Sequence, residues 1–174
     1  SKFHSGEMKK LKILTDKNMV KVYVPELVKR EYTTSIDKVV NDAFQSIVDK
    51  ISHLRGKWEF SETVINKMND LVNDASELKR ELSDFSNKSF DGWEKFVSAK
   101  IVHFRSDDID LVMDDYFSAR GVFTSPKSRK DLPDAMINTS INLLLKEVGN
   151  IVVLNKDKAF NKFLKKNAGI TVYE

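Results

Sequence analysis

Two aspartates in the last third of the chain stand in a pattern that could hold a metal ion. Asp131 and Asp134 flank a proline in the stretch RKDLPDAMI. They follow a basic loop that contains Lys127, Arg129 and Lys130. Carboxylate oxygens are the ligands that Mg²⁺ prefers, and a basic loop beside them could hold phosphate groups. The same aspartates could instead cap a helix and stabilise its first turn through backbone N–H groups and the helix dipole.

Two further carboxylates follow expected strands. Glu31 lies about two helical turns after a strand that ends at Val24, and Asp157 lies just past a strand that ends at Leu154. Asp134 opens the helix before that second strand. Because ligands bind beyond the carboxyl ends of parallel strands, the three side chains could gather around one cation, although their spacing alone does not place them within reach of one ion. The plain alternatives are a solvated helix residue for Glu31 and a turn former or helix cap for Asp157.

The first part of the chain predicts a short helix, a strand and a long helix. Apolar residues at helical spacing indicate a helix around residues 8–14. The run MVKVYV indicates a buried strand over Met19–Val24. Pro25 suits the first position of the next helix, because its missing N–H would have no partner there.

The middle of the chain, residues 55–104, is charged and has apolar residues at spacings of three and four. This pattern is typical of amphipathic helices, and we expect a helical hairpin. Asp91 and Gly92 favour a turn within FDGWEKF, residues 90–96, which would lead into the second helix.

The last part alternates helices with apolar runs. The stretch 107–123 indicates a helix, which we expect Gly121 to end. We expect a further helix to begin at Asp134 and to end at Gly149. The run IVVL is typical of a strand buried in a parallel sheet. NKDKAFNKFLKK then returns to helix, and GITVYE predicts a final strand.

Strands separated by helices predict an α/β fold with a mainly parallel central sheet and helices on both faces. The 174 residues, with only six glycines and three prolines, favour one domain over 1–174. The absence of cysteine excludes disulfides and thiolate metal sites. Without an apolar run of about 20 residues or a signal-like N-terminus, we expect a cytoplasmic protein with no membrane partner. The formal net charge of +3 neither requires nor excludes nucleic acid.

Three segments, VPELVKRE, RKDLPDAMI and VVLNKDKAF, together resemble the PIN-domain nucleases, especially a bacterial branch with a helical insertion. Glu31, Asp134 and Asp157 match three acidic positions of the family pattern. Asp131 adds a carboxylate that could ligate through water, and Asn155 stands where the family has a polar residue that orients the site. The family's first aspartate, in a strand motif such as DTN, has no counterpart before Met8. We therefore expect that first strand to be missing from the sequence given.

The resemblance implies a three-layer PIN-like fold with the helical insertion at 55–104. It also implies an endonuclease that hydrolyses phosphodiester bonds, in RNA more than in DNA, by a water activated by Mg²⁺ or Mn²⁺. Glu31, Asp134 and Asp157 would be catalytic and hold the metal with Asp131. Asn155 would orient the substrate, and the basic loop would contact the nucleic-acid backbone.

A different function is also open. The chain could be a catalytically inactive interaction module in which the helical segment Ile36–Phe104 binds a protein partner. Absence of the first family aspartate favours this alternative, whereas the three matched carboxylates favour the nuclease. A protein inhibitor and a homodimer are further partners that the sequence leaves open.

Overall fold

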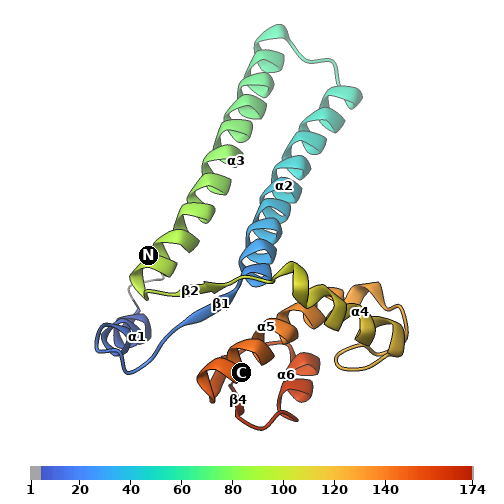
Figure 1. Ribbon diagram of the computed structural model, residues 1–174. Helices are drawn as coiled ribbons and strands as arrows, with labels where there is room; N and C mark the ends of the chain where they lie inside the picture. The colour runs from blue at the N-terminus through green and yellow to red at the C-terminus, as the bar shows by residue number, and fades with distance from the viewer. Residues whose placement is uncertain (1–4, 174) are drawn as a thin grey trace. The chain divides into compact units, whose positions relative to one another are not determined.

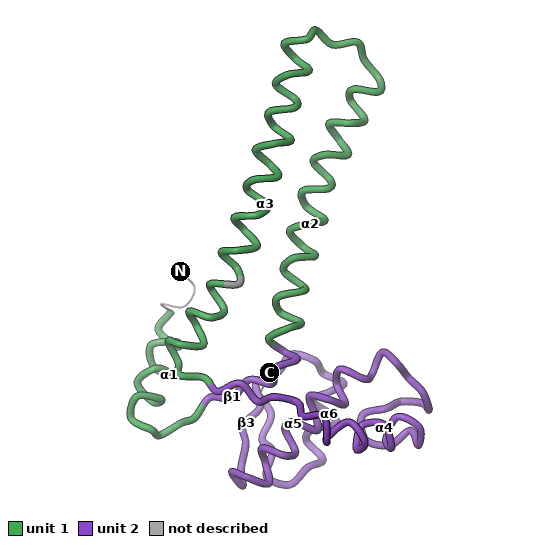
Figure 2. The backbone as a smooth tube through the Cα atoms, turned by 45° about the horizontal axis from the view of Figure 1, so that its top comes forward, with its two compact units in different colours: residues 1–21, 29–99 green, residues 22–28, 100–174 purple. Residues whose placement is uncertain are grey.

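The computed structural model of the protein describes residues 5–173, apart from the side chain of Asn87. Its helices are α1 (Gly6–Asp16), α2 (Glu26–Lys57), α3 (Glu62–Phe96), α4 (Ile109–Ser118), α5 (Leu132–Val148) and α6 (Lys158–Leu164), with 3-10 helices η2 (Ser106–Asp108) and η3 (Arg129–Asp131) (Figure 1). The strands are β1 (Tyr23–Pro25), β2 (Lys100–Val102), β3 (Ile151–Leu154) and β4 (Ile170–Tyr173). The chain divides into two compact units (Figure 2). We call residues 1–21 and 29–99 the helical unit, and residues 22–28 and 100–174 the mixed unit.

The helical unit is built around a hairpin of the two long helices α2 and α3 (Figure 1). Near its base, the Lys29 Nζ donates to Glu94 at 2.8 Å and lies 2.9 Å from an Asp91 oxygen. These two carboxylates, Glu94 first, raise the pKa of Lys29 above its ordinary 10.5. Tyr32 and Phe90 add a ring contact at 5.0 Å between centroids. The base of the hairpin is therefore held by charge and by aromatic packing.

Near the tip of the hairpin, one side chain links the two helices. Arg55 on α2 donates from Nη2 to the Ile65 carbonyl at 3.2 Å and to Asn69 Oδ1 at 2.7 Å. The hairpin thus spans α2 and α3, whereas we expected it at 55–104. The difference arises because the connection between the helices falls after Lys57, so most of the first helix precedes residue 55.

The prediction of a turn within FDGWEKF is wrong, because α3 continues through this segment to Phe96. Gly92 lies inside the helix, where glycine costs about 0.5–1 kcal/mol relative to alanine. Contacts on both sides of the glycine offset this cost. Asp91 and Glu94 both bind Lys29, and the rings of Phe90 and Trp93 lie 5.6 Å apart. Local turn preference is therefore overridden by ion pairs with α2 and by ring packing on α3.

The strands of the mixed unit pair in parallel, in agreement with the α/β expectation. Within the described residues, however, they form two separate two-stranded sheets instead of one central sheet. In the first, Tyr23 pairs with Lys100; in the second, Ile151 pairs with Ile170. Each strand has three or four residues and one partner, so a continuous sheet is not formed by residues 5–173.

Several boundaries differ from the sequence-based expectations. The strand expected over Met19–Val24 is reduced to Tyr23–Pro25. β2 falls in the region expected to be helical, because its pairing with β1 is a long-range contact. α4 ends at Ser118, before the expected Gly121, since Ala119 takes a left-handed conformation with φ of 50°. The helix that ends at Gly149 is confirmed, with φ of 86° at that glycine.

The apolar core of the mixed unit lies around α5. One cluster joins Ile137 and Ile141 of α5 with Phe160 and Leu164 of α6 and Ile170 of β4. A second cluster is formed by Val112, Phe123 and Ala135. Since α5 contributes to both clusters, its position is fixed from two sides.

Strand β3 is less buried than its all-apolar sequence indicated. Ile151 and Val153 pack against the first cluster, but Val152 and Leu154 are 61% and 78% exposed. The expectation of a fully buried strand is therefore wrong, because only one face of the β3–β4 pair is covered. Across residues 5–173, no helix combines the length and apolar character that a membrane span requires.

Candidate functional site

Asp134 lies in the first turn of α5, directly after Pro133. Proline is well suited to the start of a helix, where its missing N–H leaves no hydrogen bond unmade. Asp134 is half-buried, and the residues that follow it on α5, Ala135 and Ile137, are buried in the two core clusters. The packing of α5 therefore determines where this carboxylate lies.

Asp157 is the N-cap of α6. Its Oδ1 accepts hydrogen bonds from the backbone N–H groups of Ala159 at 2.8 Å and Phe160 at 2.9 Å. The helix-cap interpretation of this residue is thus confirmed. It does not exclude metal binding, because a carboxylate has about four acceptor positions on two oxygens and this cap uses Oδ1.

Asn155 shapes the turn between β3 and α6. Its side-chain Oδ1 accepts from the Asp157 backbone N–H at 3.3 Å, and its backbone oxygen accepts from Asn161 Nδ2 at 2.9 Å. Such a side-chain to backbone contact two residues on is typical of asparagine in turns. Asn155 therefore positions the Asp157 segment, whereas the expected role in orienting substrate stays a prediction.

The chain path brings Asp134 and Asp157 to one end of the mixed unit. A short connection through Gly149 reverses the chain between α5 and β3, so the start of α5 lies at the end where β3 finishes. Ile137 and Phe160, each three residues after its aspartate, belong to the same core cluster. The two carboxylates thus extend from neighbouring parts of one packed structure.

Two buried asparagines lie one helical turn beyond these aspartates, and the sequence interpretation missed them. Asn138 is 9% exposed and Asn161 is 1% exposed. Over the described residues, neither Oδ1 atom has a hydrogen-bond partner. A buried acceptor without a partner costs about 1–3 kcal/mol, and water or an ion commonly satisfies it. The signal was present as two Asp-x-x-x-Asn segments, DAMIN and DKAFN.

Asp131 holds a loop and does not cap α5. Its Oδ2 accepts from the backbone N–H of Thr124 at 3.1 Å and from the Thr124 hydroxyl at 3.0 Å. Although Asp131 occupies the N-cap position, its side chain makes no cap hydrogen bond, so the capping alternative is wrong for this residue. Hydrogen bonds from the Ser128 side chain and then from Thr124 hold the pKa of Asp131 below its ordinary 3.8.

The basic loop before Asp131 is exposed and ordered by local contacts. Lys127 has a left-handed backbone with φ of 60°, and its N–H donates to the Tyr116 carbonyl at 2.9 Å. Its Nζ lies 5.9 Å from the centre of the Phe117 ring. Arg129 and Lys130 belong to η3 and are exposed. Three cations are thus presented to solvent next to Asp131.

A contact between two side chains at the end of β1 was also missed. Glu26 follows β1 directly, and its Oε2 lies 3.0 Å from Nδ1 of His103. The side chain of His103 is 72% exposed. No short spacing in the sequence could have indicated a pair that joins residues 26 and 103.

Glu31 lies on α2, in the helical unit, and is exposed. It follows Leu27 by one helical turn, and Leu27 packs against the first core cluster of the mixed unit. Taken unit by unit over residues 5–173, no three His, Asp or Glu side chains gather closely enough to hold a metal ion. The convergence of Glu31 with the two aspartates therefore stays a prediction.

Comparison with known proteins yields one finding. A family model described as PIN domain matches residues 1–160. No curated protein and no solved structure matches the chain significantly. The matched range includes every residue expected in the site, from Glu31 to Asp157.

Proposed function

The chain belongs to the PIN-domain family, and from this premise we propose that it is a metal-dependent endonuclease that hydrolyses phosphodiester bonds, in RNA more than in DNA. PIN domains are in general nucleases. The observation that carries the proposal is the family match over residues 1–160. The location of Asp134 and Asp157 at one end of the mixed unit supports it.

A divalent cation fits the donors at this end of the mixed unit. Asp134 and Asp157 offer hard oxygen ligands, which Mg²⁺ and Mn²⁺ prefer. The unpartnered amide oxygens of Asn138 and Asn161 could accept hydrogen bonds from waters around such an ion. Glu31 would complete the ligand set, and Asp131 would contribute through water. When bound, the metal supplies a water of lowered pKa and offsets the negative charge of the phosphate.

The protein's own contacts prepare the ligands. Two backbone N–H groups hold Asp157 Oδ1, so this carboxylate keeps one orientation before any ion binds. Asn155 restrains the same turn from the strand side. A ligand that is already oriented loses less conformational entropy on binding. The cap of α6 therefore supports the metal-binding role as well as the helix.

The basic loop would hold the nucleic-acid strand. Lys127, Arg129 and Lys130 are exposed, and they precede Asp131 directly in the chain. Cationic side chains bind phosphates without reading bases, and their contribution to affinity falls as salt rises. We therefore expect these residues to position the strand and to leave its sequence unread.

Cleavage of single-stranded RNA and DNA, with Mn²⁺ or with chelator, tests the proposal. Asp134→Asn should lower cleavage at least about 100-fold, because even residues behind metal ligands contribute 10- to 100-fold. Asp110→Asn is a matched control, since Asp110 also lies in the first turn of a helix of the mixed unit and is exposed. It should cut like the wild type. Equal cutting by Asp134→Asn would end the catalytic assignment.

A second candidate function is an inactive module that binds a protein partner through the helical hairpin. It is favoured by the large apolar side chains that α2 and α3 expose, including Ile47, Leu71 and Phe85. Absence of Mn²⁺-dependent cutting on both nucleic acids would favour this function over the nuclease.

A further inference from the structure

Helix α3 carries an apolar seam of the kind found in coiled coils. Seven apolar residues alternate at spacings of four and three, namely Val64, Met68, Leu71, Ala75, Leu78, Leu82 and Phe85. Such a repeat places all of them on one narrow stripe, and in a coiled coil both sets of positions face a partner helix. The seam therefore predicts helical neighbours along this whole stretch.

Helix α2 covers only one side of this seam. Met68 and Ala75 are half-buried in the hairpin. Leu71, Leu78 and Phe85, which alternate with them, are 59%, 49% and 66% exposed. A half-buried stripe and a more exposed stripe thus run side by side along α3, and α2 does not cover the second one.

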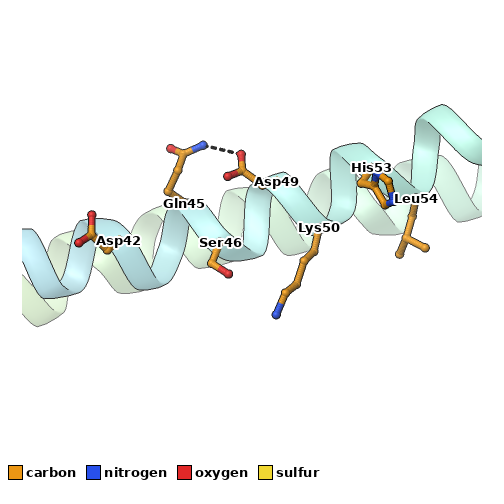
Figure 3. A pocket seen from close by; sticks show the side chains of 7 residues that line it. All are labelled: Asp42, Gln45, Ser46, Asp49, Lys50, His53 and Leu54. Carbon is orange, nitrogen blue, oxygen red and sulfur yellow. Dashed lines mark hydrogen bonds between the residues drawn. The ribbon is translucent and has the colours of Figure 1, made fainter.

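Helix α2 is arranged in the same way. Val40, Phe44 and Ile51 are half-buried, whereas Ile47 and Leu54 are 42% and 44% exposed. At about 100° per residue, the exposed residues of α2 and of α3 lie to the same side of the hairpin. Figure 3 shows Leu54 and Lys50 directed to one side of α2, and Gln45 and Asp49 to the other.

We call this surface the apolar face. It consists of Ile47 and Leu54 of α2, Trp58 directly after α2, and Leu71, Leu78, Leu82 and Phe85 of α3, each 39–66% exposed. Together they expose on the order of 700 Å², which is close to the ~800 Å² that each partner contributes to a standard interface. A patch of this size on a single protein commonly marks an interaction site.

The positions of the exposed side chains along the long axis of the hairpin, which we call their heights, make the apolar face complementary to the same face of a second copy. The contacts of Tyr32 with Phe90 and of Arg55 with Asn69 set the register of the hairpin. This register places Ile47 level with Ala75, between the heights of Leu71 and Leu78. An α2 helix laid over α3 would therefore insert its exposed residues between those of α3, as knobs enter holes.

Charges at the two edges favour one arrangement of two copies. Lys50 lies on the outer edge of α2, and Asp74 lies on the outer edge of α3 at nearly the same height; both are exposed. If α2 of one copy lies over α3 of the other, Lys50 and Asp74 meet at each edge. If α2 of one copy instead lies over α2 of the other, Lys50 meets Lys50 and Asp74 meets Asp74. Opposite charges in register favour the first arrangement.

We propose that two copies of the chain associate through the apolar face into an antiparallel four-helix bundle, with α2 of each copy over α3 of the other. The two hairpins would then point the same way, and each helix would be antiparallel to its neighbours. The association does not depend on the metal site or on nuclease activity.

The mass of the full chain in solution tests this proposal, measured by sedimentation equilibrium without nucleic acid or metal. We expect a dimer at micromolar concentration. Leu78→Glu should raise the dimer dissociation constant at least ~30-fold, as for a central interface residue. Leu111→Glu is the matched control, because Leu111 is 54% exposed on α4 and lies outside the apolar face. It should leave the constant unchanged, and far-ultraviolet circular dichroism should show equal helix content in all variants.

A charge exchange tests the arrangement of the two copies. Lys50→Glu and Asp74→Lys should each weaken the dimer, and the double variant should restore it. A wild-type chain that stays monomeric at high micromolar concentration would overturn the proposal. So would a dimer that Leu78→Glu leaves intact, or a double variant that is no tighter than the single ones.

Discussion

At the residue scale, Asp157 is a helix cap in the structure and also a proposed metal ligand. Its Oδ1 caps α6 through Ala159 and Phe160. We propose the same residue as a metal ligand, and it lies within the range matched by the PIN-domain model. A helix cap needs an oxygen acceptor, whereas the proposed metal ligand needs a negative charge. Substitution by asparagine keeps the acceptor and removes the charge, and substitution by alanine removes both.

We predict that Asp157→Ala lowers the free energy of unfolding by about 1 kcal/mol, the usual cost of losing a helix cap. Asp157→Asn should lose much less stability, since asparagine caps helices about as well as aspartate. Both variants should lose Mn²⁺-dependent cleavage. Urea unfolding measures the first effect, and the assay on nucleic acid measures the second. An alanine variant as stable as the wild type would contradict the cap observed here.

Asp131 gives a prediction about acid stability. Its pKa is lowered in the folded protein by Ser128 and Thr124, so its ionised form stabilises the fold. This stabilisation is fully present above the ordinary pKa of 3.8 and is lost as the pH falls through the lower folded pKa. Asp131→Asn should therefore be less stable than the wild type at neutral pH, and the difference should shrink below pH 3.8. A pH series of urea unfolding curves measures this, and a constant difference would count against it.

At the scale of single elements, α3 shows how contacts with a neighbouring helix override a turn signal. Asp91 and Gly92 favour a turn by their types, yet α3 runs through them to Phe96. Lys29 binds Asp91 and Glu94, which stand on the same side of the helix. The glycine is therefore a weak point of a helix and not its end.

We predict that Gly92→Ala stabilises the protein by about 0.5–1 kcal/mol, because alanine has the higher helix propensity. A Cβ atom at this position would meet no atom within 4 Å. Gly149→Ala is the control with the opposite sign, since Gly149 ends α5 with φ of 86°. Thermal unfolding of the three proteins measures both effects. If Gly92→Ala were destabilising, the segment 90–96 would be a turn in solution.

At the scale of the whole molecule, most of the proposed metal ligands lie in the mixed unit, and the proposed dimer interface lies in the helical unit. The mixed unit contains the core clusters and the three aspartates of the expected site, Asp131, Asp134 and Asp157, whereas the helical unit contains Glu31 and the apolar face. Metal binding and dimerisation are therefore separable by substitution. Asp134→Asn should leave the dimer unchanged, and Leu78→Glu should leave metal affinity unchanged.

We predict that Mn²⁺ stabilises the folded protein. An ion that binds only the folded state at ten times its dissociation constant adds about 1.4 kcal/mol. The unfolding temperature of the wild type should rise with Mn²⁺, and chelator should reverse the rise. Asp134→Asn should show little rise, whereas Asp110→Asn should behave like the wild type. Differential scanning calorimetry measures all three. The same rise in Asp134→Asn would show that the ion binds elsewhere.

The sequence by itself determined the elements whose signals are local. Proline near the start and Gly149 at the end marked α5, and alternating apolar spacing marked α3, because caps and helical periodicity act over a few residues. The resemblance to PIN domains also came from short segments, and the family match confirmed it.

Other features were decided only by the tertiary structure. β2 exists because Lys100–Val102 pairs with a strand more than seventy positions earlier, and three residues carry too little signal alone. The burial of Asn138 and Asn161 depends on how α5 and α6 pack around one core. Which side of the α3 seam stays exposed depends on where α2 lies. These features arise from contacts between distant residues, and their energies do not appear in any short stretch of the chain.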